Sequence, residues 1–348
     1  MATINAIVYN NGVLSLIDQR ALPTVVEMFE CRTYKEIEFA IKDMVVRGAP
    51  AIGATAAYGV LLASIEFKKS TSNFDEYRRN MQDAIAFLNA SRPTAVNLMW
   101  AMKQMLDLFE DSRKSINEIH TNIEKLALRI HAEDIETNKT MAKHGNEVIP
   151  QGATILTHCN TGALATAGYG TALGVIREAH YTGKDIFVFA DETRPRLQGG
   201  RLTAWELMQE KIPSKLIADS SAASLIRDGK IDVILVGADR IALNGDTANK
   251  VGTFMLSVIA KEYNVPFYIV APTTTIDFDI ELGEEIEIEE RSSEEISHIS
   301  GIRIAPEGMD IYNPAFDVTP SKFITGIITE KGIVKAPFKE NILKLKEL

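Results

Sequence analysis

The chain has 348 residues, 46% of them hydrophobic and 24% charged, which is typical of a globular protein with two domains. Its net charge of −10 argues against nucleic acid as the main partner, because clustered Lys and Arg normally meet a phosphate backbone. The two cysteines, the absence of a basic-then-apolar leader and the lack of long uninterrupted apolar runs predict free thiols, no signal peptide, no membrane span and a cytoplasmic protein.

The first 50 residues predict a small antiparallel sheet followed by helix. Apolar alternation over residues 4–18 is interrupted by Asn11-Gly12, a strong hairpin signal. A capping box at Thr33–Glu36 then opens a helix.

The segment Arg47-Gly48-Ala49 precedes a second helix, which Pro50 suits at its first turn. Gly48 permits close backbone approach, and the Arg47 cation lies beside free helix-start N–H groups, so the segment is a candidate phosphate clamp. From these local features alone, a solvated loop arginine explains Arg47 equally well.

Two amphipathic helices are expected at residues 73–90 and 94–110, and the break between them carries Arg92, a second candidate anion ligand. A further capping box begins a long helix over residues 115–148. Its three histidines are too far apart or too differently oriented to share a metal ion, so we interpret them as packing or surface residues: His120, His131 and His144. This predicts an N-terminal domain over residues 1–125, mostly helical with a small sheet, and a long helix leading into a second domain over 126–348.

After residue 150, short apolar strands alternate with helical segments, which predicts a mostly parallel sheet. The expected strands are Thr154–Thr157, Ile186–Ala190, Leu216–Ala218, Ile231–Val236, Pro266–Ala271 and Phe323–Thr329. Polar residues follow several of these strands, as a ligand site at one sheet edge requires, although polar loops after strands are also common.

The stretch Gly152–Arg177 carries the first reactive side chain. A buried strand runs into Cys159 and then a Gly/Ala-rich segment that predicts a helix start, where the helix dipole favours an acidic thiol. Asp239 follows another strand, so both side chains are expected to face one crevice. Inert packing of Cys159 and a helix cap at Asp239 are the alternatives.

Two polar loops, Thr193–Thr203 and Asn244–Thr253, offer donors to a sugar or phosphate. The chain lacks a dinucleotide fingerprint, a phosphate-binding P-loop, zinc-spaced His and Cys residues and a G-x-S-x-G elbow. We therefore expect no metal and no cofactor, and a proton shift on a small phosphorylated polyol with Cys159 and Asp239 as complementary acid and base.

Five motifs together resemble the methylthioribose-1-phosphate isomerases, in the superfamily that includes the α, β and δ subunits of translation initiation factor 2B. They are RGAPAIG (47–53), SRPTAVNL (91–98), HCNTGALATAGYGTAL (158–173), ETRPRLQGGRLTAWEL (192–207) and GADRIALNGDTANKVGT (237–253). The resemblance spans nearly the whole chain. It implies a homodimeric α/β protein with a Rossmann-like C-terminal domain, acting as an aldose-1-phosphate to ketose-1-phosphate isomerase.

The resemblance also implies specific roles. It assigns catalysis to Cys159 and Asp239, and phosphate and sugar contacts to Arg47, Gly48, Ala49, Arg92, Gln198, Asn249 and Lys250. The expected reaction is 5-methylthioribose 1-phosphate to 5-methylthioribulose 1-phosphate, in methionine salvage. The hydrogen moves between C2 and C1 by a cis-phosphoenolate or by a hydride shift, and the sequence does not choose between these routes.

Three other functions stay open at this point. The first is isomerisation of 5-deoxyribose 1-phosphate by a paralogue. This sugar differs from 5-methylthioribose 1-phosphate only in the group on C5, and a pocket distinguishes one thiomethyl group by roughly a few kcal/mol at most. Ribose-1,5-bisphosphate isomerisation needs more cations for its second phosphate. A non-catalytic regulatory subunit like those of initiation factor 2B is the alternative of a different class.

Overall fold

A computed structural model describes residues 4–92, 96–110 and 115–346, and these form two compact units. The N-terminal unit runs to Lys139 and also contains the later segment Gly162–Gly170. The C-terminal unit comprises Thr140–Thr161 and the chain from Thr171 onward. The expected domain boundary at residue 125 lies in the same long helix as the boundary between the units, and two separately folding domains stay a prediction.

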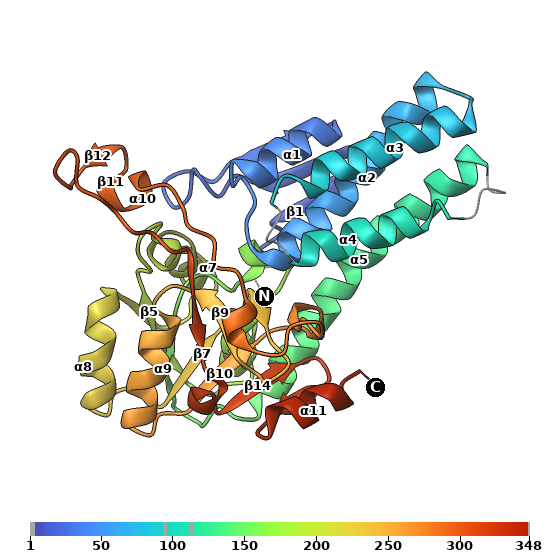
Figure 1. Cartoon of the computed structure of the whole chain (residues 1–348). Coiled ribbons are helices and arrows are strands. Elements are labelled where there is room, and N and C mark those ends of the chain that lie inside the picture. Colours follow the sequence, from blue (N-terminus) through green and yellow to red (C-terminus); the bar gives the residue numbers. More distant parts are fainter. Residues whose placement is uncertain (1–3, 93–95, 111–114, 347–348) are drawn as a thin grey trace. The chain divides into compact units, whose positions relative to one another are not determined.

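Among its described residues, the N-terminal unit combines a three-stranded antiparallel sheet with five α-helices and one short 3-10 helix (Figure 1). The strands are β1 (Ile7–Asn10), β2 (Val13–Ile17) and β3 (Met28–Cys31), and the helices are α1 (Tyr34–Lys42), α2 (Ala49–Ser70), α3 (Phe74–Asn89), α4 (Val96–Asp107), α5 (Ile116–Asn146) and the short η1 (Ala163–Ala165). The last turns of α5 belong to the C-terminal unit. The hairpin turn has positive φ at both Asn11 (47°) and Gly12 (81°), as its sequence predicts.

Both predicted capping boxes are present. Thr33 Oγ1 accepts from the Glu36 N–H at 3.3 Å while the Glu36 carboxylate accepts from the Thr33 N–H at 2.9 Å. Ser115 and Glu118 exchange the same pair of hydrogen bonds at the start of α5. Of the predicted break between α3 and α4, only Ser91 and Arg92 lie within the described residues.

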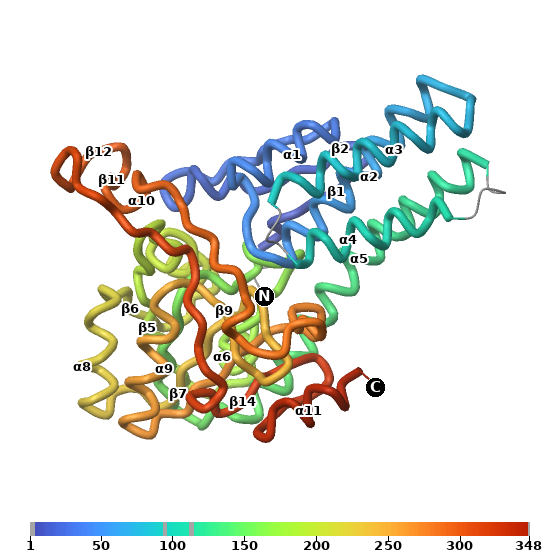
Figure 2. The backbone as a smooth tube through the Cα atoms, viewed as in Figure 1, coloured from blue at the N-terminus to red at the C-terminus, as the bar shows by residue number. Residues whose placement is uncertain are grey.

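Helix α2 is the core of the N-terminal unit. It is the one described helix long and apolar enough to cross a membrane, but 78% of its most apolar window is buried inside the protein. Helices α1, α3 and α4 all pack against it (Figures 1 and 2). A mostly buried helix of this kind is typical of a protein core.

The C-terminal unit is built on a seven-stranded sheet in the order β15-β14-β10-β7-β4-β5-β6. The strands are β4 (Thr154–Thr157), β5 (Phe187–Asp191), β6 (Ser214–Ile217), β7 (Val233–Val236), β10 (Phe267–Val270), β14 (Gly326–Thr329) and β15 (Gly332–Val334). All neighbours pair in parallel except β14 and β15. The expected α/β architecture with a mostly parallel sheet is confirmed.

Strand order locates the ligand-binding edge. In chain order the six parallel strands run 3-2-1-4-5-6 across the sheet, the arrangement of doubly wound nucleotide-binding folds. From β4 the chain crosses to β5 on one side, and from β7 it crosses to β10 on the other. The loops after β4 and β7 therefore diverge, and at this point folds with this strand order place the crevice that binds a ligand.

Helices cover both faces of this sheet, because strands such as VILV (Val233–Val236) are apolar on both sides. One face packs against α8 (Ala222–Arg227), α9 (Thr253–Glu262) and α11 (Phe338–Lys344), and the other against α6 (Ala172–Tyr181), α7 (Ala204–Gln209) and the last turns of α5. Helices α8 and α9 lie side by side in the cartoon and in the backbone tube (Figures 1 and 2).

A second, antiparallel sheet in the order β13-β9-β8 follows β7. Its strands are β8 (Arg240–Ile241), β9 (Thr247–Lys250) and β13 (Phe316–Thr319). The remaining elements are the π-helix η2 (Gly199–Thr203), the 3-10 helices η3 (Asp219–Ser221), η4 (Thr273–Thr275), η5 (Gly283–Glu285) and η6 (Ser321–Phe323), the short helix α10 (Glu294–Ser297) and the hairpin β11 (His298–Ile299) and β12 (Ile302–Arg303).

Two local expectations were wrong. The Gly/Ala-rich segment after Cys159 does not start a long helix, because α6 begins only at Ala172, so the helix-dipole argument for an acidic Cys159 thiol fails. The segment Asn244–Thr253 is not simply a loop, because its second half forms strand β9, paired on both sides by β8 and β13.

Candidate active site

Cys159 lies two residues beyond the end of β4, at the central edge of the sheet. Its φ is +65°, a left-handed conformation that is uncommon for a residue with a side chain, and 9% of it is exposed. The backbone N–H of Cys159 donates to Thr193 Oγ1 at 2.8 Å, and Thr203 Oγ1 donates to its carbonyl at 2.6 Å. Hydrogen bonds from the β5–α7 connection thus hold this strained residue on both sides.

The residue after Cys159 is anchored by a buried ionic network. Asn160 Nδ2 donates to Glu206 Oε1 at 2.8 Å, and Glu206 is paired with Arg177 at 2.9 Å. Each of these side chains is at most 4% exposed. Such a network fixes the backbone at Cys159 from helices α6 and α7.

Asp239 follows β7, the strand beside β4, and is half-buried. No helix begins there: its N–H donates to the Ala248 carbonyl at 2.9 Å, and β8 starts at the next residue. The helix-cap alternative for Asp239 is therefore wrong. Because β4 and β7 are adjacent parallel strands, Cys159 and Asp239 follow the two strand ends at which the loops diverge.

Lys250, at the end of β9, is a buried cation with 5% exposure. Its Nζ donates to the Ala315 carbonyl at 2.6 Å and lies 4.3 Å from the centre of the Phe316 ring. Within the described residues no carboxylate oxygen comes within 4.0 Å of Nζ. Burial lowers the pKa of Lys250 to about 8, and the charges of Cys159 and Asp239 act in the opposite direction, so both groups lie within its electrostatic range.

Two amides complete this part of the site. Asn249, 3% exposed, donates to Thr253 Oγ1 at 2.9 Å. Gln198 is 7% exposed, and its Oε1 has no hydrogen-bond partner in the described chain. A buried amide oxygen without a partner suits a bound hydroxyl group.

The other predicted contacts lie in the N-terminal unit. Gly48, with φ +98°, precedes α2, and a Cβ there would lie 2.3 Å from the Ala165 carbonyl oxygen, so the site requires glycine. Arg47 and Ala49 flank it and are half-buried, as is Arg92. A Cβ at Gly53 would lie 2.9 Å from the Asn97 carbonyl oxygen, so the first turns of α2 and α4 pack together.

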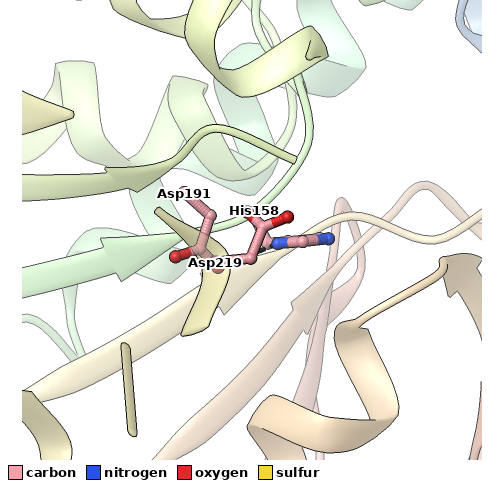
Figure 3. A group of neighbouring side chains, drawn as sticks. All are labelled: His158, Asp191 and Asp219. Carbon is pink, nitrogen blue, oxygen red and sulfur yellow. Dashed lines mark hydrogen bonds and ion pairs between the residues drawn. The ribbon is translucent and has the colours of Figure 1, made fainter. Parts of the chain in front are cut away.

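A cluster that the sequence did not identify joins the ends of β4, β5 and β6. His158, Asp191 and Asp219 have one potential ligand atom each within 4.8 Å of one another, a spacing that a metal ion could use (Figure 3). Their hydrogen bonds favour a different interpretation. His158 Nδ1 lies 2.8 Å from Asp191 Oδ2 and Nε2 lies 3.0 Å from the Val251 carbonyl.

The third member, Asp219, is also engaged. Its two carboxylate oxygens accept from the N–H groups of Thr193 and Arg194, each at 2.7 Å. Both imidazole nitrogens and both Asp219 oxygens therefore already have protein partners, whereas the buried Asp191 Oδ1 has none among the described residues. His158 precedes Cys159 in a motif that the sequence did single out, but its partners are set by tertiary structure.

A family model described as the initiation factor 2 subunit family matches residues 45–336. The chain belongs to this family, whose model spans both units. Within it, the chain belongs with the methylthioribose-1-phosphate isomerases. It is 68% identical, over 99% of this chain and 100% of the relative, to a protein of that name from Caldanaerobacter subterraneus subsp. tengcongensis. The resemblance inferred from the motifs is confirmed.

Solved structures agree with this placement. A 5-methylthioribose 1-phosphate isomerase from Pyrococcus horikoshii OT3 matches with a TM-score of 0.93 and 46% identity, over 99% of this chain and 96% of that one. A structure described as the translation initiation factor eIF-2B subunit delta from A. fulgidus matches with a TM-score of 0.88 and 41% identity, over 99% of both chains. The fold is therefore shared by proteins described as an enzyme and as a translation factor.

Proposed function

We propose that this protein is an isomerase that converts 5-methylthioribose 1-phosphate to 5-methylthioribulose 1-phosphate, a step of methionine salvage. The observation that carries the proposal is the buried Lys250 ammonium, which has no carboxylate partner among the described residues and lies within electrostatic range of Cys159 and Asp239. A buried cation of this kind favours an anionic ligand, such as a sugar phosphate. The high identity to enzymes of that name supports the same substrate.

The chemistry assigns a task to each group. A phosphate on the anomeric oxygen blocks spontaneous ring opening, so a general acid must protonate the ring oxygen, and we assign this to Asp239. The hydrogen on C2 then moves to C1. Cys159 acts as the base in a cis-phosphoenolate route, or stabilises developing charge in a dry site during a hydride shift.

The remaining binding roles are those that the family resemblance implies. We propose that Lys250 binds phosphate in the C-terminal unit, and that the N-terminal unit offers Arg47, the helix-start N–H groups at Gly48 and Ala49, and Arg92 as anion ligands. Gln198 and Asn249 are assigned to the sugar hydroxyls, because buried amides can both donate and accept.

The decisive experiment measures kcat/KM of the purified protein on matched 5-methylthioribose 1-phosphate and 5-deoxyribose 1-phosphate. We expect a preference of about a hundredfold, ~2.7 kcal/mol, for the thiomethyl sugar. Cys159→Ala and Asp239→Asn should each lose most turnover and stay folded, whereas Cys31→Ala, at the buried second cysteine on β3, should retain it.

Each other outcome has a defined meaning. A reversed preference assigns the protein to 5-deoxyribose disposal, and comparable values mean that one pocket serves both sugars. No turnover on either substrate overturns the proposal and favours a regulatory subunit. The structural match to the A. fulgidus protein described as an eIF-2B delta subunit is the reason to consider this alternative. Near-normal rates in Cys159→Ala or Asp239→Asn remove that residue from catalysis.

A further inference from the structure

His158 connects three segments of the C-terminal unit. It is 1% exposed and adjoins Cys159 at the end of β4. On one side of the ring, Nδ1 meets the Asp191 carboxylate at the end of β5; on the other, Nε2 meets the Val251 carbonyl, one residue beyond Lys250. The imidazole thus bridges the strand end that carries Cys159 and the strand end that carries Lys250.

Hydrogen-bond chemistry fixes the polarity of this bridge. A carbonyl oxygen only accepts, so Nε2 must carry a proton and donate to Val251. Nδ1 then shares a single proton with Asp191, and the carboxylate stabilises the doubly protonated ring. Although burial lowers the pKa of His158, the hydrogen bond and charge of Asp191 outweigh it and the net direction is upward.

The turn after Lys250 passes close to the imidazole ring of His158. A Cβ at Gly252, whose φ is +105°, would lie 3.0 Å from His158 Cε1. The turn that contains Gly252 is held on its other side by Asp317, which accepts from the Gly252 N–H at 2.7 Å and the Phe254 N–H at 3.0 Å. Lys250 therefore ends a strand whose following turn is fixed between His158 and Asp317.

We propose that His158, oriented by Asp191, is a positioning residue that holds the Lys250 ammonium in register with Cys159 for phosphate binding. The ring does not act on the reacting atoms, because both of its nitrogens are engaged by protein groups. The inference rests on the proposed function in so far as Lys250 binds the substrate phosphate. A metal-binding role would require these hydrogen bonds to break first.

Two substitutions separate the two sides of the bridge. The amide of His158→Asn occupies the position of Nδ1 and can still donate to Asp191, but it is too short to reach Val251. The amide of His158→Gln occupies the position of Nε2 and can still donate to Val251. We expect KM for the sugar phosphate to rise at least about tenfold in His158→Asn, kcat to change less than about threefold, and KM to recover in His158→Gln.

The Kd of inorganic phosphate, measured by calorimetry on the same proteins, should follow the same pattern without any turnover. His180→Asn is the matched control. His180 lies in the last turn of α6, which runs from the end of β4 to the start of β5, and therefore lies at the opposite edge of the sheet. We expect this variant to match the parent protein in both KM and Kd.

Equal changes in the Asn and Gln variants, or a fall in kcat at constant KM, would overturn the inference. If the parent protein binds phosphate but turns over neither sugar, the proposed function is wrong. The Kd values of the parent protein, His158→Asn and His158→Gln still decide the role of His158. If the parent protein turns over the sugar normally and KM and Kd do not differ between His158→Asn and His158→Gln, the positioning role is wrong and the proposed function stands. A parent protein that neither binds phosphate nor turns over either sugar contradicts both.

Discussion

Lys250 lies in an environment unlike that of an ordinary surface lysine. Its ammonium lies against a carbonyl and an aromatic face, with no carboxylate within ion-pair distance in the described chain. Burial, which outweighs the opposing charges of Cys159, Asp239 and Glu295, disfavours the charged form and lowers the pKa of Lys250 to about 8. A dianionic phosphate supplies the missing counter-charge, so ligand binding and protonation of Lys250 favour each other.

This coupling predicts a pH dependence. As pH rises above about 8, the free protein loses the Lys250 proton and with it the cation to which we assign phosphate binding. Above this pH we expect kcat/KM to fall about tenfold per pH unit because KM rises. We expect kcat to stay constant, because bound phosphate keeps Lys250 charged. The measurement is a pH series of initial rates from pH 6 to 10.

An ordinary cysteine also titrates near this range, so the assignment needs a control. Arginine stays charged at every pH used here. In Lys250→Arg the alkaline fall should move above pH 10, even though the larger guanidinium lowers the overall rate. An alkaline limb that is unchanged in this variant would assign the titration to another group.

At the scale of elements, α5 organises the N-terminal unit through the segment Gly162–Gly170. Asp134 on α5 accepts from the Ala167 N–H at 2.7 Å and from Asn138 Nδ2 at 3.0 Å. Gln19 Nε2 donates to the Leu164 carbonyl at 2.7 Å. These bonds tie a segment that follows Cys159 closely in sequence to the helices of the N-terminal unit.

Asp134 is partly buried and its pKa is raised to about 7 by burial, which outweighs its two donors. The unfolded chain ionises this group near pH 4, so between roughly pH 4 and 7 the native state holds the extra proton. Stability therefore falls as pH rises through this window, by at most about 4 kcal/mol from this group. In Asp134→Asn the free energy of urea unfolding should change less between pH 4.5 and 7.5.

The exposed Asp107, at the end of α4, offers the matched substitution. Asp107→Asn should retain the pH dependence of the parent protein. If Asp134→Asn retains it as well, burial of the Asp134 carboxyl does not produce the effect.

At the scale of the whole molecule, the homodimer expected from the family resemblance stays a prediction. The C-terminal unit carries apolar side chains that are unusually exposed near its β11–β12 hairpin: Ile302 (70%), Ile304 (56%), Met309 (64%) and Tyr312 (76%). Such a group typically becomes covered in an assembly. Light scattering after size-exclusion chromatography should give twice the chain mass of 38.4 kDa, and a mass of one chain at micromolar concentration would contradict it.

The local elements and the mostly parallel sheet of the C-terminal unit could be predicted from the sequence. Capping boxes, the Asn11-Gly12 turn and short apolar runs act through neighbouring residues. The helices, turn and strands that they form can therefore be predicted without knowing the fold. The strand β4 was predicted with its observed bounds. The candidate site residues came from motifs, and their roles stay predictions.

The surroundings of those residues could not be predicted in the same way. The left-handed Cys159, the buried Lys250 on a strand rather than a loop, and the His158–Asp191 bridge all depend on partners between 33 and 93 residues away in the chain. No local pattern encodes such a pairing, because it arises when separate strands end at one edge of a sheet. The sequence names the chemical groups, and the order of the strands determines which of them meet.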